Sequence, residues 1–233
     1  MNRLAKDANS IGIEISSLAS GMLWGSSLTS DDATVREKAK DVVRRQIEAA
    51  SALGTDAILV IPGAVDVFFM PGGEIIPYDR VHERLRDALQ QVLPHAEKHK
   101  VAIGLENVWN KFFLSPLEMR DFVDYFKSKY VGVFFDTGNI VPFGYPEQWI
   151  RILGHRIKRV HVKDFRRAVG TIEGFVDLLE GDVDWPAVVK ALADVGYDSY
   201  LIAEMIPLYR HHPAARIKNA STALDYILGR VRA

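Results

Sequence analysis

Four short strand-like runs in this 233-residue chain, most of their residues apolar, each stop at a side chain that can bind a proton or a metal ion. Apolar runs of this length are typical of parallel strands that are buried on both faces. A charged group in such a strand is costly unless it is paired or bound to a metal. The four side chains are Glu106 after 101–105, Asp136 after 131–135, His161 after 157–160 and Glu204 after 200–203. Because all four occupy the same relative position, they predict one shared site, and this set of donors suits a divalent cation.

Strand-like and helix-like patterns alternate along the chain, which predicts βα units around a parallel sheet and therefore an α/β fold. We expect Ser30 to cap the first long helix and Pro94 to kink or end the second. No linker, low-complexity tract or break in composition divides the chain, so we expect one domain over residues 1–233. The six predicted strands are Gly12–Leu18, Ala57–Pro62, Val101–Asn107, Val131–Thr137, Ile157–Lys163 and Tyr200–Met205.

The number of strands leaves two architectures open. A closed (β/α) barrel needs eight strands, whereas an open doubly wound sheet accommodates six without strain. The four strand-end side chains favour the barrel, because all strand C-termini of a barrel converge on one mouth. In an open twisted sheet the outer strands diverge, so four ligands from four strands meet much less readily.

Charge and composition exclude several classes of function. The net charge is −1 and the sequence shows no basic stripe, which argues against nucleic acid as the main partner. The absence of cysteine excludes disulfides, thiolate zinc sites and cysteine nucleophiles. No apolar run approaches the roughly 20 residues of a membrane span, and the polar first ten residues lack the pattern of a signal peptide. We therefore expect a soluble cytoplasmic protein that acts on a small molecule.

Glu106 and Glu204 have two chemical uses. They can bind a cation, and they can take or give a proton on opposite faces of a substrate carbon. Each can also be a buried carboxylate that an arginine or backbone N–H groups satisfy. His161 is the only one of seven histidines in a strand-like context. Asp136 opens the sequence Asp-Thr-Gly-Asn, which also fits an ordinary turn.

Polar and aromatic residues close to these strand ends are candidates for substrate contacts. Asn107 and Asn139 each follow a predicted ligand, and Lys163 lies where the histidine strand enters a polar mouth. Arg166 or Arg167 can stabilise an oxyanion or hold a phosphate, or the two can be a solvated pair on a loop. Four aromatic residues are expected in loops that follow strands, where they can line a substrate pocket or only pack against neighbouring side chains. They are Trp24, Phe68, Phe69 and Trp109.

Several segments together resemble one known family, the xylose isomerase-like TIM-barrel superfamily of sugar phosphate isomerases and epimerases. Within it the chain is similar to ketose 3-epimerases, including those that act on L-ribulose 5-phosphate and D-tagatose. The resemblance covers the chain from about residue 11 to its end. The segments are Gly-Leu-Glu-Asn-Val-Trp-Asn at 104–110, Phe-Asp-Thr-Gly-Asn at 135–139, Val-His-Val-Lys-Asp at 160–164, Gly-Asp-Val-Asp-Trp at 181–185 and Gly-Tyr-Asp at 196–198.

The resemblance implies a role for each matching residue. The metal ligands would be Glu106, Asp136, His161 and Glu204, and the two glutamates would also be the catalytic acid and base. Arg167 would bind substrate, and we expect further substrate contacts from Asn107, Trp109, Asn139 and Lys163. The implied cofactor is one divalent metal ion, with Mn²⁺ expected first and Mg²⁺, Co²⁺ or Zn²⁺ as variants.

The chain departs from the family pattern at two places. Asn139 stands where some members have a histidine, so the substrate contact there differs. The family barrel also starts with two βα units that the sequence pattern does not show. We therefore expect a (β/α)8 TIM barrel of the xylose isomerase-like type that lacks its first two βα units and has about six strands. Unpaired barrel edges invite association, so we expect a homodimer.

The function that the resemblance implies is a metal-dependent sugar or sugar-phosphate isomerase or epimerase. It would act on a ketose through a cis-enediolate, with two glutamates as acid and base. Three alternatives stay open: an inosose-type dehydratase of the same superfamily, a metal-binding barrel with impaired catalysis, and a metallo-phosphodiesterase or abasic-site endonuclease. The last of these needs several metals and additional histidines at the strand ends, which this set does not provide.

Overall fold

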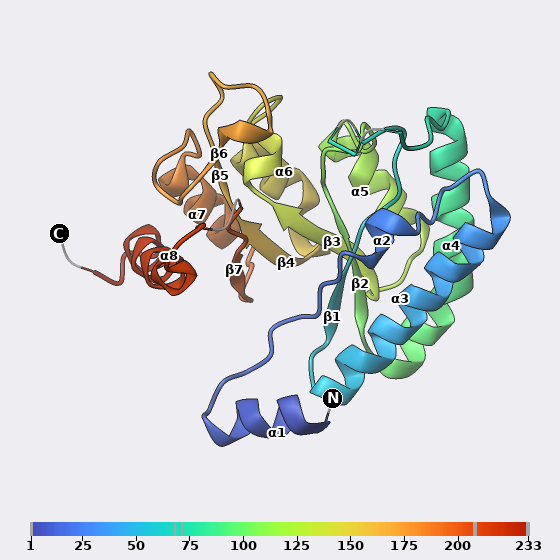
Figure 1. The fold of residues 1–233 in the computed structure, drawn as a ribbon, viewed down its shortest axis with the longest axis horizontal. Helices are drawn as coiled ribbons and strands as arrows, with labels where there is room; N and C mark the ends of the chain where they lie inside the picture. Colours follow the sequence, from blue (N-terminus) through green and yellow to red (C-terminus); the bar gives the residue numbers. More distant parts are fainter. Residues whose placement is uncertain (1, 68, 71, 207–208, 232–233) are drawn as a thin grey trace. The chain divides into compact units, whose positions relative to one another are not determined.

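The computed structural model describes residues 2–67, 69–70, 72–206 and 209–231 of the chain (Figure 1). The chain divides into two compact units, Met1–Phe134 and Phe135–Ala233, called unit 1 and unit 2 below. The expectation of one domain over residues 1–233 stays a prediction.

The described part of unit 1 contains three strands of a parallel sheet, and side chains along all three are buried. Burial on both faces explains why these strands are almost uninterrupted apolar runs. In the register between the second and third strands, Glu106 lies opposite Phe134. The strands are β1 (Ala57–Val60), β2 (Ala102–Glu106) and β3 (Val131–Asp136), with β1 paired to β2 and β2 to β3. The last two residues of β3 belong to unit 2.

The long helices of unit 1 have clear ends. The helix expected to start at Ser30 is instead capped by Asp32, whose side chain accepts a hydrogen bond from the Thr34 N–H. The Ser30 hydroxyl donates to Glu74, and its oxygen accepts the Asp32 N–H in the turn that precedes the helix. Gly54 closes this helix in the left-handed conformation, as glycine does most easily. The helices of unit 1 are α1 (Asn2–Ser10), α2 (Met22–Gly25), α3 (Ala33–Leu53), α4 (Tyr78–His99) and α5 (Pro116–Tyr125). Helices α3 and α4 lie side by side (Figure 1).

Pro94 does not end α4, which continues to His99. The expectation of an early end was therefore wrong. Proline removes one N–H donor from a helix, and the burial of Leu89, Val92 and Ala96 on the same helix offsets that loss.

The strand predicted over Gly12–Leu18 was also wrong for most of its length. Within this segment, all of which the structure describes, Leu18 alone bridges Ile58 of β1, through its N–H to the Ala57 carbonyl and its carbonyl to the Leu59 N–H. Ile13 is 57% exposed. Because the side chains before the bridge have little to pack against, the pairing does not extend backwards along the segment.

The described part of unit 2 contains two further parallel strands, a small hairpin and three α-helices. The parallel strands are β4 (Ile157–Val162) and β7 (Leu201–Ala203), with His161 opposite Ile202. The hairpin pairs β5 (Asp164–Phe165) with β6 (Phe175–Val176) in antiparallel fashion and was not predicted. The helices are α6 (Pro146–Leu153), α7 (Trp185–Asp194) and α8 (Pro213–Ile227), and the 3-10 turns are η1 (Gly138–Ile140), η2 (Gly154–Arg156) and η3 (Ile172–Gly174). Helix α7 contacts both α6 and α8.

Each unit has its own buried apolar residues. Ile58, Ile103 and Val133 are fully buried in the sheet of unit 1, and Val160 and Val162 are fully buried in β4 of unit 2. Among the described residues, no helix has both the length and the apolar character needed to cross a bilayer.

Candidate metal and substrate site

The strand ends of unit 2 bring together three of the four predicted metal ligands. Asp136 is the last residue of β3, His161 lies in β4, and Glu204 follows β7 directly. Glu204 is two residues beyond Ile202, the register partner of His161, so alternation along the strands places both side chains on the same face. The Glu204 N–H donates to the Val162 carbonyl at 3.2 Å, which extends the pairing to the acidic residue itself.

The three side chains are close enough to share one ion. One ligand atom from each of Asp136, His161 and Glu204 lies within 4.8 Å of the others. His161 Nδ1 is 3.7 Å from Glu204 Oε2 and 4.0 Å from Asp136 Oδ2. Asp136 is fully buried, whereas the Glu204 side chain is 36% exposed. Two carboxylates and an imidazole around one point are the ligands that borderline and hard divalent cations take.

Lys163 lies inside this cluster. Its Nζ is 2.5 Å from Glu204 Oε2 and 3.2 Å from Asp136 Oδ2. It also donates to Asn139 Oδ1 at 3.4 Å and lies 4.7 Å from the centre of the Phe175 ring. Sequence reasoning predicted a substrate contact for Lys163, and the structure shows in addition that its ammonium neutralises the two carboxylates.

The charges around Glu204 change its pKa. Burial alone would raise the pKa, but the positive charge of Lys163, followed by that of His161, outweighs it and holds the pKa below its ordinary value. Glu204 is therefore a carboxylate at neutral pH. This is the form that binds a cation or accepts a proton from carbon.

Thr137 and Gly138 lock the end of β3 to the end of β4. The Thr137 hydroxyl donates to the Lys163 carbonyl at 2.8 Å, and the Thr137 N–H donates to the His161 carbonyl at 3.1 Å. A Cβ at Gly138 would lie 2.9 Å from the Lys163 carbonyl oxygen. Asp136 Oδ1 accepts the Asn139 N–H at 2.7 Å, so one oxygen of the carboxylate shapes the turn while the other faces His161.

Replacing Gly138 by alanine should destabilise unit 2. The added methyl group meets backbone, which cannot rotate away, so the two strand ends must separate, and we expect a loss of about 1–3 kcal/mol in the free energy of unfolding. Urea denaturation measures this loss. Gly21→Ala is the matched control, because Gly21 has a φ of −75° and a methyl group there would meet no described atom within 4 Å; it should change stability by less than about 0.5 kcal/mol. Equal effects of the two variants would contradict the tight approach of the strand ends.

Asp164 has a structural role that sequence reasoning missed. Its buried carboxylate accepts four hydrogen bonds, from the backbone N–H groups of Phe165, Leu179 and Val183 and from Trp185 Nε1, at 2.9–3.2 Å. A Cβ at Gly181 would lie 2.1 Å from Asp164 Oδ1. The two sequence segments 160–164 and 181–185 are thus two sides of one contact, and a carboxylate holds them together.

The predicted site residues of unit 1 lie at the end of β2. Glu106 is the last residue of the strand and is 4% exposed. Asn107 follows it and is buried, and Trp109 is half-buried. The carboxyl end of this strand therefore carries a buried acid, as the sequence predicts.

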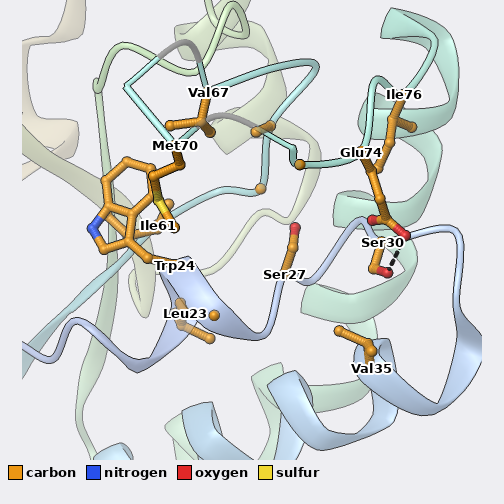
Figure 2. Close-up of a pocket in the computed structure, with 14 residues that line it drawn as sticks. Leu23, Trp24, Ser27, Ser30, Val35, Ile61, Val67, Met70, Glu74 and Ile76 are labelled. Atoms are coloured by element: carbon orange, nitrogen blue, oxygen red, sulfur yellow. Dashed lines mark hydrogen bonds between the residues drawn. The ribbon is translucent and has the colours of Figure 1, made fainter.

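A cavity of about 270 Å³ in unit 1 lies beside the segment that follows β1 (Figure 2). Trp24 lines it and meets the ring of Phe69 edge to face, with centroids 5.4 Å apart. On the opposite side, the Ser30 hydroxyl donates to Glu74 Oε1 at 2.9 Å. The cavity thus has an apolar wall and an acidic one. The aromatic residue Phe68 lies outside the described residues.

Arg167 lies two residues after β5, in the loop that connects β5 to β6. Its Nε donates to the Val141 carbonyl at 3.0 Å, and its guanidinium carbon is 5.4 Å from the centre of the Tyr145 ring. Its own N–H donates to Asp182 Oδ2 at 2.7 Å. These contacts orient Arg167, and its role in substrate binding stays a prediction.

Comparison with known proteins gives a family match and structural matches that cover nearly the whole chain. Residues 1–227 match the family described as xylose isomerase-like TIM barrel. A structure of L-ribulose 3-epimerase has a TM-score of 0.81 with 19% identity and covers 98% of this chain and 80% of that one. A structure of the IolI protein with a bound zinc atom has a TM-score of 0.78 with 18% identity, over 100% of this chain and 82% of that one. At these identities the structures establish the fold.

Curated sequences give weaker likenesses over part of their length. An uncharacterized protein of Methanocaldococcus jannaschii, MJ1311, is 26% identical over 177 residues, or 73% of this chain and 57% of the relative. L-ribulose-5-phosphate 3-epimerase UlaE of Escherichia coli is 25% identical over 195 residues, or 83% of this chain and 65% of the relative. The chain thus spans less than two thirds of the length of these relatives.

Proposed function

Because the chain belongs to the xylose isomerase-like TIM-barrel family, we propose that it is a metal-dependent isomerase or epimerase of a sugar or sugar phosphate. The convergence of Asp136, His161 and Glu204 at the strand ends of unit 2 carries this proposal. The similarity to L-ribulose-5-phosphate 3-epimerase supports a ketose as the substrate.

Glu106, at the end of β2, is the fourth ligand that we propose for the metal. It lies opposite Phe134 in the β2–β3 register, and Asp136 is two residues beyond Phe134 on the same strand. Three carboxylates and one imidazole fit a divalent cation, and the zinc atom in the similar IolI structure supports this choice of class. The preference for Mn²⁺ stays a prediction.

The bound metal would act as a Lewis acid that polarises the substrate carbonyl and makes the neighbouring C–H more acidic. One of Glu106 and Glu204 would then remove the proton from that carbon. The other would return a proton to the opposite face, which inverts the carbon. Return of the proton to the adjacent carbon would instead give an aldose–ketose isomerisation, and the same two carboxylates can serve both outcomes.

Neighbouring residues would position the substrate. Lys163, held against Asp136 and Glu204, is placed to donate to a substrate oxygen and to balance the charge of the carboxylates. Asn139 accepts from Lys163 and lies on the turn that Asp136 shapes. Arg167 and residues Asn107 and Trp109 are further proposed contacts. The cytoplasmic location and the homodimer stay predictions.

Proton–deuterium exchange tests the proposal. In D₂O with Mn²⁺, at least one ketose or ketose phosphate in a panel should gain deuterium at the carbon next to its carbonyl, as read by proton NMR. Removal of the metal with EDTA should lower exchange to the uncatalysed level, because the carbon acid is then too weak for a carboxylate base. Restoration of Mn²⁺ should bring the exchange back.

The same assay has an outcome that contradicts the proposal. Equilibrium dialysis can show that the protein binds the metal tightly. If it does, and no sugar in the panel gains deuterium or is converted into another sugar, the proposed enolising activity is wrong. A control reaction with denatured protein at the same Mn²⁺ concentration separates enzymatic exchange from exchange catalysed by the free ion.

A further inference from the structure

A second cluster of metal-ligating side chains lies between α3 and α4 of unit 1. It consists of Glu48 on α3 and of His95 and His99 on α4. One ligand atom from each of the three lies within 4.8 Å of the others. His95 and His99 are four residues apart, so they project from the same face of the helix on successive turns. Their ring centroids are 4.5 Å apart.

One possible ligand atom of this cluster is poorly satisfied by hydrogen bonds. His95 Nε2 is buried and lies 3.2 Å from Glu48 Oε1, yet it makes no hydrogen bond to any described residue. A buried imidazole nitrogen beside a carboxylate without a hydrogen bond has lost its water and gained little in return. A metal ion between the two side chains would satisfy both.

The cluster is separate from the strand-end residues. Helix α4 ends at His99, and β2 begins three residues later at Ala102, so the cluster lies near the start of β2. Glu106 lies at the other end of the strand, about 13 Å farther along at about 3.3 Å per residue. A metal at the cluster cannot therefore take part in chemistry at Glu106.

The ends of the helices add a favourable field. The last turns of a helix carry the negative end of its dipole, which attracts cations. His95 and His99 lie in the last two turns of α4, and Glu48 lies toward the end of α3. Lys98 lies on the same turn of α4, and its positive charge repels a cation. The ligands must therefore bind the metal strongly enough to overcome this repulsion.

We infer that Glu48, His95 and His99 form a second metal site that binds a borderline divalent ion of the Zn²⁺, Ni²⁺ or Cu²⁺ class. Two imidazoles and one carboxylate suit these ions, whereas Mg²⁺ and Mn²⁺ favour oxygen ligands. In a tetrahedral zinc site the ligand atoms are about 3.3 Å apart, so a small side-chain adjustment closes the observed cluster. The bound ion would link α3 to α4.

Zinc binding to variants tests the inference. The variants His99→Gln and Glu48→Gln should each bind one equivalent of Zn²⁺ less than the wild type, or bind it more than about tenfold more weakly. Equilibrium dialysis against Zn²⁺, followed by metal analysis, measures both quantities. Glu48 is exposed, so its variant should fold normally. Zn²⁺ at ten times its Kd should raise the Tm of the wild type by about 3–5 °C. This rise should shrink in both variants.

Two controls make the result specific. His155→Gln removes an exposed histidine outside both clusters, and it should leave the bound zinc and the Tm shift unchanged. His161→Gln tests the strand-end site by itself, so failure of one site does not obscure the other. Unchanged zinc content and unchanged Tm shift in both His99→Gln and Glu48→Gln would overturn the inference.

Discussion

Replacement of Glu204 by glutamine is expected to lower the rate of metal-dependent proton exchange on the ketose substrate by about 10²–10⁴-fold. Glutamine has nearly the same shape but cannot take a proton from carbon, and it is a weaker ligand for a cation. It also removes one of the two negative partners of Lys163, whose Nζ is 2.5 Å from Glu204 Oε2 and 3.2 Å from Asp136 Oδ2. The measurement is the initial rate of deuterium incorporation by proton NMR at saturating Mn²⁺.

The control for this substitution is Glu173→Gln. Glu173 is an exposed carboxylate of η3 in the same unit, so it tests whether any loss of a negative charge from unit 2 lowers the rate. Its rate should stay within about twofold of wild type. If Glu204→Gln keeps more than a tenth of the wild-type exchange rate at saturating metal, Glu204 is not the acid or base.

Replacement of Asp164 by alanine is expected to lower the free energy of unfolding by about 3–5 kcal/mol. The substitution leaves four N–H donors without an acceptor, three of them buried, among them the indole of Trp185. Each buried donor without a partner costs about 1–3 kcal/mol, and relaxation of the loop reduces the sum. Urea denaturation followed by tryptophan fluorescence gives the loss directly.

Asp182→Ala is the matched control for the Asp164 substitution. Asp182 belongs to the same loop, is exposed, and accepts a hydrogen bond from the Arg167 N–H. Its removal should cost less than about 1 kcal/mol, because water replaces the lost partner. A comparable loss of stability in the two variants would show that Asp164 does not hold the loop.

The convergence of acidic and histidine side chains at the strand ends could be predicted because its signal is local. A charged residue that ends an apolar run is visible within six residues of sequence, and parallel topology supplies the convergence. The structure places Asp136, His161 and Glu204 together in unit 2. The short hairpin β5–β6 has no such signal, since two-residue strands have no periodicity to detect.

Other features depend on partners distant in sequence. The backbone N–H groups of Leu179 and Val183 reach Asp164 only after the loop folds back. No sequence pattern predicts which backbone N–H groups will donate to a given side chain. The histidine pair of α4 is visible as a spacing of four residues, but Glu48 on another helix is not. The described segment 12–18 has the composition of a strand, yet a strand needs a packed partner, and within it only Leu18 pairs.

The chain after β4 consists of an anchored residue, Asp164, followed by an exposed loop. Asp164 fixes the base of the loop close to Lys163, whereas residues 166–173 are exposed. Apart from Gly170, whose φ of +66° disfavours any side chain, residues 168–173 can therefore be varied with little effect on the residues at the end of β4. Substitutions or insertions that change this loop can be confined to the other five positions without disturbing the strand ends.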